Sequence, residues 1–469
     1  MKTVNKTQSM PIINEQTVET TLARSASTSK ARLDEVLAKA AECKGLEPDE
    51  IASLAAIEDP DPLARLFTTA KAVKEHIYGR RLVLFAPLYI SNHCVNECAY
   101  CAFRAKNALI TRKALSQMEI RREVEFLVDR GHKRLLLLTG ESHSNSSFSY
   151  LLDSIETVYS VKRDRGEIRR VNVEIAPASV EEFRQLKAAK IGTYICFQET
   201  YHHATYAAVH LGGKKRDYDW RVGVFDRAME AGIDDVGIGV LFGLYDWKFE
   251  LLALFQHIRH LEATFGVGPH TISVPRLEPA TGSALAGKPP HAVADIDFKK
   301  IVAILRLAVP YTGIIMSTRE SAEMRNETFA LGVSQISAGS RTNPGGYSSG
   351  DLTAADGQFS LGDHRPLDEV IRDVATMGYV PSFCTGCYRL GRTGADFMDL
   401  ARPGEIKEHC DPNAVSTFLE YLIDYGSEET KKTGESLIAK TIAGMSGVAR
   451  ERTEKIVEQV RSGKRDVYC

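Results

Sequence analysis

Three thiols lie within eight residues of this sequence. Residues 94–101 read CVNECAYC, which places Cys94, Cys98 and Cys101 in a C-x3-C-x2-C spacing. Thiolates are soft ligands that suit zinc, copper(I) and iron–sulfur clusters. A zinc site would need a fourth ligand nearby, and His93 lacks the usual separation because it directly precedes the first cysteine. Three cysteines around a 4Fe–4S cluster would leave one iron open to a small molecule.

A second set of three cysteines follows near the C-terminus. Cys384, Cys387 and Cys410 have a C-x2-C-x22-C spacing. A structural zinc site with His409 as its fourth ligand and a group of unrelated thiols are both alternatives here. The repeated three-thiol pattern favours a second cluster with one open iron. Clustered thiols in a long chain indicate metal or redox sites rather than a disulfide framework.

Eight apolar or β-branched runs would have to position these thiols. They alternate with amphipathic, helix-like segments from residue 81 onward, which implies parallel strands joined by crossovers. The runs are 81–90, 134–140, 171–177, 193–200, 235–244, 271–279, 313–321 and 333–340. Eight such units predict an α/β fold of the (βα)8 TIM-barrel type, with a doubly wound open sheet as the alternative.

Polar residues gather where these runs end. The residues at or just past a C-terminal end are Cys94, Glu141, Glu174, Glu199, Arg276, Arg319 and Ser340. Barrel enzymes place their chemistry at this edge of the strands. We therefore expect a site there, built from several strands.

The rest of the chain divides into extensions of the barrel. Residues 1–80 form a predicted helical N-terminal extension, of which 1–25 are polar and expected to be disordered. The barrel is assigned to 81–380, and 381–469 to a helical C-terminal domain that carries the second thiol set. The Gly-, Ser- and Asp-rich segment 339–366 is expected to cap a site or join domains.

Composition excludes several functional classes. The chain has 59 Lys and Arg against 61 Asp and Glu, so no excess of positive charge supports nucleic-acid or anionic-membrane binding. Its apolar runs are far shorter than the roughly 18 residues that a membrane helix needs, and the N-terminus has no signal-peptide core. We expect a soluble, cytoplasmic protein.

The first thiol motif resembles the radical S-adenosylmethionine (SAM) superfamily. It follows the first strand, and Tyr100 precedes its third cysteine. LTGE at 138–141 resembles the segment that holds the SAM amino group, with Glu141 as its acidic residue. GIGVLFGL at 237–244 resembles the glycine-rich strand that faces the adenine. The resemblance implies a 4Fe–4S cluster whose open iron binds SAM and whose electron releases a 5′-deoxyadenosyl radical.

Finer matches resemble the branch that contains biotin synthase. FQETYH at 197–202 and KKRDYDWR at 214–221 imply that Glu199 lies near the SAM ribose or the substrate and that Arg216 contacts the SAM carboxylate. Glu174 joins the expected SAM contacts. The alternative for Arg216 is a solvated charge at the start of a helix.

Over nearly its whole length the chain resembles the HydG family, tyrosine lyases that act as FeFe-hydrogenase maturases. The matching segments include PHTISVPRLEPA, MSTRES and the C-terminal thiol pattern. The resemblance implies cleavage of the L-tyrosine Cα–Cβ bond to p-cresol and dehydroglycine, which becomes carbon monoxide and cyanide at an auxiliary 4Fe–4S cluster. It also implies an electron donor of the ferredoxin or flavodoxin type and other hydrogenase maturation proteins as partners.

The same resemblance suggests roles for three further residues. Arg319 and Ser317 would anchor tyrosine, since a guanidinium binds a carboxylate bidentately. His270 would hold an additional labile iron at the auxiliary cluster. An ion pair for Arg319 and a structural hydrogen bond for His270 are the alternatives.

Two other functions remain open at this point. A 2-iminoacetate synthase of thiamine biosynthesis would perform only the first half of the reaction and would not need Cys384, Cys387 and Cys410. A non-catalytic iron–sulfur carrier would leave the LTGE, FQET and KKRD segments without a purpose.

Overall fold

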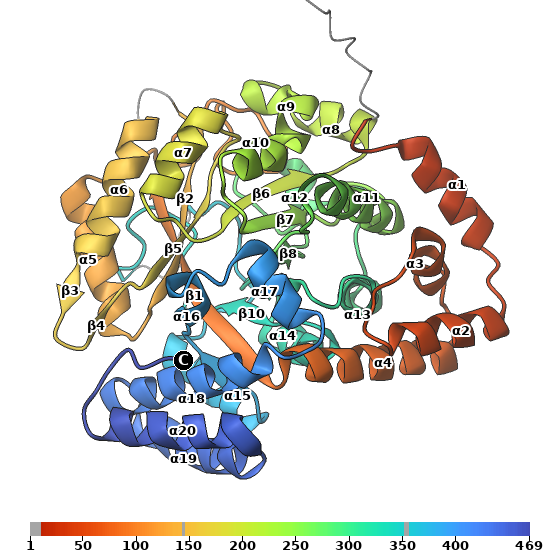
Figure 1. Cartoon of the computed structure of the whole chain (residues 1–469). Coiled ribbons are helices and arrows are strands. Elements are labelled where there is room, and N and C mark those ends of the chain that lie inside the picture. The colour runs from red at the N-terminus through yellow and green to blue at the C-terminus, as the bar shows by residue number, and fades with distance from the viewer. Residues whose placement is uncertain (1–10, 143–145, 351–355) are drawn as a thin grey trace, which may run out of the picture.

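The computed structural model describes residues 11–142, 146–350 and 356–469. Its centre is a closed barrel of eight parallel strands, because the last strand pairs with the first (Figure 1). The strands are β1 (Arg81–Ser91), β2 (Arg134–Thr139), β5 (Arg170–Glu174), β6 (Tyr194–Glu199), β7 (Val236–Val240), β8 (Thr271–Ser273), β9 (Gly313–Met316) and β10 (Gln335–Ser337). Each strand overlaps one predicted run, and only β1 and β5 extend past theirs, by one residue each, so the TIM barrel is confirmed and the open sheet is wrong.

Helices between the strands form the outer layer. The longer ones are α5 (Gln117–Asp129), α6 (Phe148–Ser160), α7 (Val180–Ala188), α10 (Val224–Glu230), α11 (Trp247–Phe265), α13 (Asp295–Ala308), α14 (Ala322–Leu331) and α15 (Leu367–Thr376). The shorter elements are β3 (Lys162–Arg163), β4 (Gly166–Glu167), α8 (His203–Val209), η1 (Lys214–Arg216), α9 (Tyr218–Val222) and α12 (Ala284–Gly287). Capping boxes start two of them: Ser116 with Glu119 begins α5, and Ser179 with Glu182 begins α7.

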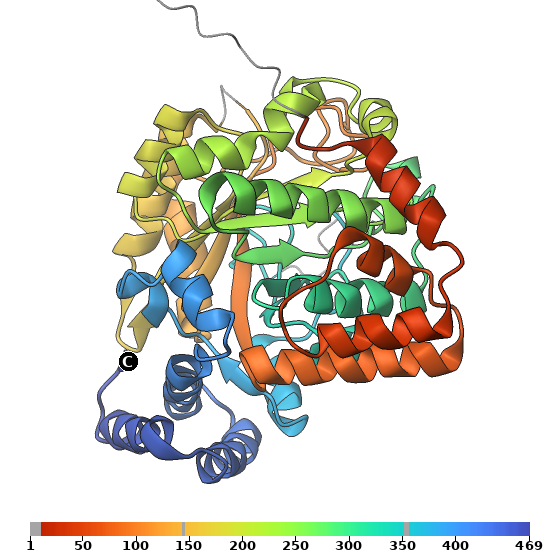
Figure 2. The ribbon, with the colours of Figure 1, turned by 45° about the vertical axis from the view of Figure 1, so that its right-hand side comes forward.

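The N-terminal extension is helical and packs beside the barrel (Figure 2). It contains α1 (Glu15–Ser25), α2 (Lys30–Ala40), α3 (Pro48–Ala55) and α4 (Pro60–Tyr78). The expectation of disorder up to residue 25 is wrong for α1, and residues 1–10 lie outside the described part. Asn14 caps this helix, and buried Val18 and Thr21 face its contacts with α3 and α11. Tertiary packing therefore orders a segment of low hydrophobicity.

The C-terminal segment begins as an added strand. β11 (Val380–Ser382) pairs with the start of β1, Arg81 opposite Val380. The helices that follow are α16 (Gly386–Arg389), α17 (Gly394–Ala401), α18 (Lys407–Asp424), α19 (Glu428–Ala443) and α20 (Gly447–Arg461). They lie against the end of the barrel where β1 begins (Figure 1). No helix in the described part of the chain is both long and apolar enough to cross a bilayer.

The main apolar core lies between strands and helices, and a second, smaller cluster fills the inside of the barrel. Phe85, Tyr89, Leu136, Ile195 and Ile315 belong to the inner cluster and are buried. Because side chains alternate along a strand, β1, β2, β6 and β9 contribute to both layers.

Candidate active sites at the two ends of the barrel

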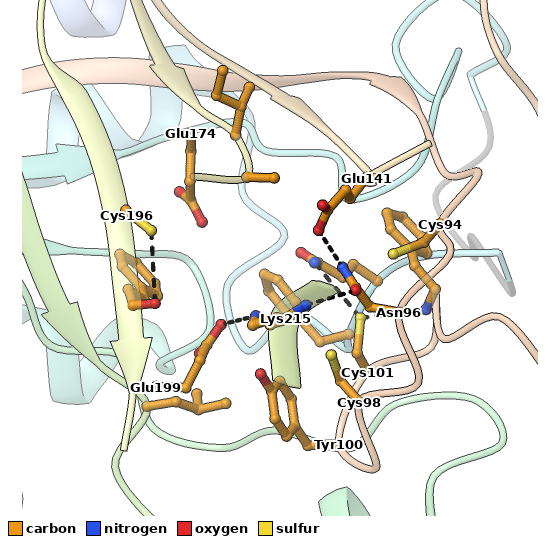
Figure 3. Close-up of a pocket in the computed structure, with 18 of the residues that line it drawn as sticks. Cys94, Asn96, Cys98, Tyr100, Cys101, Glu141, Glu174, Cys196, Glu199 and Lys215 are labelled. Carbon is orange, nitrogen blue, oxygen red and sulfur yellow. Dashed lines mark hydrogen bonds and ion pairs between the residues drawn. The ribbon is translucent and has the colours of Figure 1, made fainter. Parts of the chain in front are cut away.

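A cavity of about 130 Å³ lies at the C-terminal ends of the strands (Figure 3). It gathers most of the residues predicted from the sequence. Those in its wall are Cys94, Cys98, Tyr100, Cys101, Glu141, Glu174, Glu199 and Arg319. We call it the upper cavity.

The loop that carries the first thiol set is held by backbone hydrogen bonds on both sides. Val95 N donates to Glu141 O at 2.7 Å, and Ala99 N donates to Val209 O at 2.8 Å. A Cβ atom at Gly140 would lie 2.3 Å from His93 O, so only glycine permits the close approach of β2 to this loop. The cysteines are thus presented from a fixed backbone.

The donor chemistry of the upper cavity fits an iron–sulfur cluster. All three thiols are free, and burial raises the pKa of Cys98 to about 12 and of Cys101 to about 11. Thiols with pKa values this far above neutral need a strongly bound metal to become thiolates. Within the described ranges no three His, Cys, Asp or Glu side chains form a ready-made site for a single metal ion. Three soft donors in the wall of one cavity match the cluster better than the zinc alternative.

Glu199 ends β6 in a strained conformation that turns its carboxylate toward two cations. Its φ is 72°, and Lys215 Nζ lies 2.5 Å and Arg221 Nη2 3.7 Å from Glu199 Oε1. Burial alone would raise the pKa of Glu199, but Lys215 and Arg221 bring it below its usual value. Glu199 is therefore a buried, ionised carboxylate beside the thiols.

The turn after Glu199 is held from behind by Glu250 of α11. Thr200 Oγ1 donates to one oxygen of Glu250, and Tyr201 N donates to the other at 2.8 Å. Glu250 is fully buried, and this burial raises its pKa to about 8. Helix α11 thus fixes the backbone on which the strain at Glu199 depends.

The structure does not bring Arg216 into this cavity. In the 3-10 turn η1, Lys214 and Arg216 are exposed, and Lys215 is the member of the run that faces the thiols. The backbone N of Lys215 donates to Asn96 Oδ1 at 3.0 Å, which fixes the turn against the cluster loop. Besides Arg319, the cations that line the cavity are Lys215 and Arg221, and neither of these two was predicted.

The other two predicted carboxylates lie in different surroundings. Burial, and then the nearby charge of Glu199, raise the pKa of Glu174 to about 7. Glu141 accepts a hydrogen bond of 2.5 Å from Asn96 Nδ2. Figure 3 shows both side chains directed into the same space as the thiols.

A second, mostly apolar cavity of about 80 Å³ adjoins the first inside the barrel, and we call it the inner cavity. Arg319 lines both cavities, whereas Ser317 lines only the inner one. The Arg319 guanidinium lies 3.2 Å from the centre of the Phe359 ring, and burial lowers its pKa. Ser340 also lines the inner cavity, with its buried hydroxyl unpaired among the described residues.

Gln358 joins these two cavities and was not predicted. Its Nε2 donates to Cys101 Sγ at 3.8 Å, and its Oε1 accepts from Tyr89 OH at 2.8 Å. It belongs to the long segment expected to cap a site, and part of that segment, residues 351–355, lies outside the described residues. The capping segment thus reaches a proposed cluster ligand directly.

The second thiol set lies at the opposite end of the barrel. Cys384, Cys387 and Cys410 come from the end of β11, from α16 and from α18, and all three are buried and free. They line a cavity of about 50 Å³ together with His270, which precedes β8, and we call it the lower cavity. His409 does not line it, so the structure does not form the alternative zinc site with His409 as its fourth ligand.

Charged and aromatic groups surround the lower thiols. Arg81 lies among them and, although burial lowers its pKa, nearby Cys410, Asp411 and Cys384 raise it above its usual value. His270 Nε2 shares a hydrogen bond of 2.9 Å with Tyr388 OH, and burial lowers the pKa of this histidine. A neutral imidazole and three thiols in the wall of one cavity form a donor set that suits zinc as well as iron.

Strand β1 connects the three cavities in order. Arg81 and Val83 line the lower cavity, Phe85, Pro87 and Tyr89 the inner one, and Cys94 just beyond the strand the upper one. Alternate side chains of a strand point to the same side, here the inside of the barrel. The two thiol sets therefore face each other along the barrel axis.

Comparisons with known proteins agree with this arrangement. Residues 88–255 match the Radical SAM superfamily, and residues 273–380 match the Biotin and Thiamin Synthesis associated domain. The 2-iminoacetate synthase of Salmonella typhimurium is 32% identical over 337 residues, which cover 72% of this chain and 86% of that protein.

Two solved structures are similar over almost the whole chain. The crystal structure of HydG, a maturase of the FeFe-hydrogenase, has a TM-score of 0.94 and 49% identity, and covers 98% of this chain and all of that one. HydG from Carboxydothermus hydrogenoformans has a TM-score of 0.83 and 40% identity, and covers 94% of this chain and 97% of that one.

Proposed function

Because the chain belongs to the HydG family of radical SAM enzymes, we propose that it cleaves L-tyrosine in the barrel and converts the fragment to carbon monoxide and cyanide. The observation that carries this proposal is the pair of three-thiol sets at opposite ends of one barrel. The products would serve assembly of the FeFe-hydrogenase cofactor. Three units share the work: an N-terminal extension over 1–80, the barrel over 81–380 and an auxiliary-cluster domain over 381–469.

The upper cavity would hold the SAM-binding cluster and SAM. Cys94, Cys98 and Cys101 are the proposed ligands of a 4Fe–4S cluster, which supplies the electron that splits SAM into methionine and a 5′-deoxyadenosyl radical. Glu141 and Glu199 are aimed at the space where the polar groups of SAM would lie. The buried Tyr100 hydroxyl shares a hydrogen bond of 2.8 Å with His210 Nε2, which would keep the wall beside Cys98 and Cys101 rigid.

Tyrosine would bind between the upper and inner cavities. Arg319 is placed to take the carboxylate bidentately, with Ser317 and Ser340 as hydrogen-bond partners on the inner side. Glu174 would accept a proton or a hydrogen bond from the amino group, since its pKa of about 7 lets it change charge near neutral pH. The apolar walls exclude water from radical chemistry.

The lower cavity would complete the reaction. Cys384, Cys387 and Cys410 are the proposed ligands of an auxiliary 4Fe–4S cluster, with His270 holding an additional labile iron that receives the products. Dehydroglycine, HN=CH–COO⁻, balances to carbon monoxide, cyanide and one water. Because this imine hydrolyses in bulk solvent, passage through the inner cavity protects it. Electrons would come from a ferredoxin or flavodoxin, and other cytoplasmic maturation proteins would take the iron product.

A 2-iminoacetate synthase is the second candidate, supported by the 32% identity to that enzyme. It would use the upper and inner cavities alone and leave the lower thiols and His270 without a role. The carrier hypothesis is weaker still, since it leaves Glu199, Lys215 and Arg319 around the upper cavity unexplained.

One experiment separates these functions. The enzyme is reconstituted anaerobically with iron and sulfide, given SAM, dithionite and tyrosine, and assayed for deoxyadenosine, p-cresol, cyanide and carbon monoxide together. We expect all four, and a Cys384→Ala/Cys387→Ala/Cys410→Ala variant that retains p-cresol but forms no carbon monoxide. p-Cresol alone from the wild type indicates the iminoacetate synthase, and absence of deoxyadenosine would refute radical chemistry.

A further inference from the structure

A fourth cavity, open to the surface, lies beside the lower cavity. Its volume is about 640 Å³, and we call it the basic crevice because six cations against three carboxylates line it. The cations are Lys162, Arg169, Arg170, Lys187, Lys190 and Arg389. Four of these cations form ion pairs: Lys162 with Glu167, Arg169 with Glu420 and Asp466, Arg170 with Asp235, and Arg389 with Asp466. Lys187 and Lys190, at and just after the end of α7, are exposed and form no ion pair among the described residues, so their charge is available to a ligand at the mouth.

A single layer of side chains separates the basic crevice from the lower cavity. Tyr388 lines both. On the inner side, the Tyr388 hydroxyl shares a hydrogen bond of 2.9 Å with His270 Nε2, and the Arg170 guanidinium packs over the Tyr388 ring. Arg170 in turn pairs with Asp235 at 3.2 Å. Rotation of the Tyr388 side chain would join the two spaces, because Tyr388 is the one described residue that lines both of them.

The charge of the lining selects what can pass. The ammonium groups of Lys187 and Lys190 at the mouth repel aqueous Fe²⁺ and attract small anions. Iron would be admitted when anionic ligands such as carboxylates, thiolates or cyanide outweigh or reduce the positive charge of the ion, so that the whole complex is anionic or less cationic. The upper cavity offers no such route, since it lies at the other end of the barrel.

We propose that the basic crevice is the port through which iron enters and leaves the lower cavity as a small anionic complex, with Tyr388 as its gate. This rests on the proposed function, because it requires an exchangeable iron beside His270. The port would let iron turn over without opening the barrel mouth, where radical chemistry needs a closed site.

The test uses reconstituted holoenzyme and two iron chelators of matched shape: uncharged 2,2′-bipyridine and anionic 2,2′-bipyridine-4,4′-dicarboxylate. The rate of iron removal is followed by the absorbance of the ferrous chelate. In a Lys187→Glu/Lys190→Glu variant we expect removal by the dicarboxylate to slow about tenfold at low ionic strength, and removal by bipyridine to stay within about twofold. Salt should shrink the difference.

The matched control is Lys432→Glu/Lys440→Glu on α19, which makes the same charge change at two exposed positions remote from the crevice. Tyr388→Ala should speed both chelators several-fold, whereas Tyr388→Phe, which keeps the ring, should not. Equal slowing in the control, or unchanged dicarboxylate rates in Lys187→Glu/Lys190→Glu, would overturn the port. If wild-type enzyme yields iron to neither chelator, no exchangeable iron is present and the port is wrong, while p-cresol formation reports independently on tyrosine cleavage.

Discussion

Replacement of Lys215 by methionine tests the proposal that SAM binds in the upper cavity. Methionine keeps much of the side-chain volume but removes the cation that lies 2.5 Å from Glu199 Oε1. Both side chains are nearly buried, with 14% and 10% of their surfaces exposed, so solvent cannot replace the lost partner. Arg221 remains 3.7 Å away and keeps part of the charge balance.

The expected loss follows from this geometry. A hydrogen bond between charged groups contributes roughly 1.5–3 kcal/mol, and a fully broken buried pair costs about 3–5 kcal/mol. With Arg221 retained, we expect about 2 kcal/mol, or about 30-fold weaker SAM binding. Burial would then raise the pKa of Glu199 with less opposition, so the defect should lessen as pH rises.

The assay is a SAM titration of the reduced, reconstituted enzyme, followed by the electron paramagnetic resonance spectrum of the cluster. Lys214→Met and Arg216→Met are matched controls from the same turn, both exposed, and should bind SAM as the wild type does. A large loss in Arg216→Met with normal binding in Lys215→Met would refute the reasoning and restore the role predicted for Arg216 from the sequence.

Three further predictions concern the surroundings of this site. Because the pKa of Glu174 is raised to about 7, binding that needs its carboxylate should strengthen about tenfold between pH 6 and 8, and tyrosine or SAM titrations of Glu174→Gln should lose this dependence. The pKa of Glu250 is raised to about 8 in the folded protein, so the free energy of unfolding should fall as pH rises from about 5 to 8; thermal melts of Glu250→Gln that keep the same slope would contradict this. Gln358→Leu removes the N–H donor to Cys101 Sγ and should make the cluster harder to reduce, measured as a more negative midpoint potential; an unchanged potential would show that the contact does not tune the cluster.

The barrel was predictable because its strands repeat in sequence. Eight apolar runs separated by amphipathic segments leave few other folds, and the structure has one barrel strand overlapping each run. Helix α1 was missed because its order comes from packing against α3 and α11 rather than from its own composition. Local sequence signals this kind of tertiary stabilisation poorly.

The site was predictable where chemistry dictates residue type and spacing, as in both cysteine sets and the strand-end carboxylates. Orientation within a short turn was not predictable, because Lys214, Lys215 and Arg216 are equivalent in sequence. The tertiary hydrogen bonds of the Lys215 backbone with Asn96 and Tyr206, and its ion pair with Glu199, make Lys215 the residue that faces inward. Gln358 was missed because it meets Cys101 across 257 positions of the chain, and a glutamine in a polar segment carries no signal by itself.

The order of the cavities along β1 has a kinetic consequence. Under the proposed function, one dehydroglycine molecule confined to the inner cavity of about 80 Å³ is at a concentration on the order of 10 M. At such an effective molarity the lower cavity would need little intrinsic affinity for dehydroglycine to be saturated. Selection would then favour fast release of the iron product over tight binding of dehydroglycine. The lower cavity would therefore bind dehydroglycine poorly when this molecule is supplied from bulk solvent.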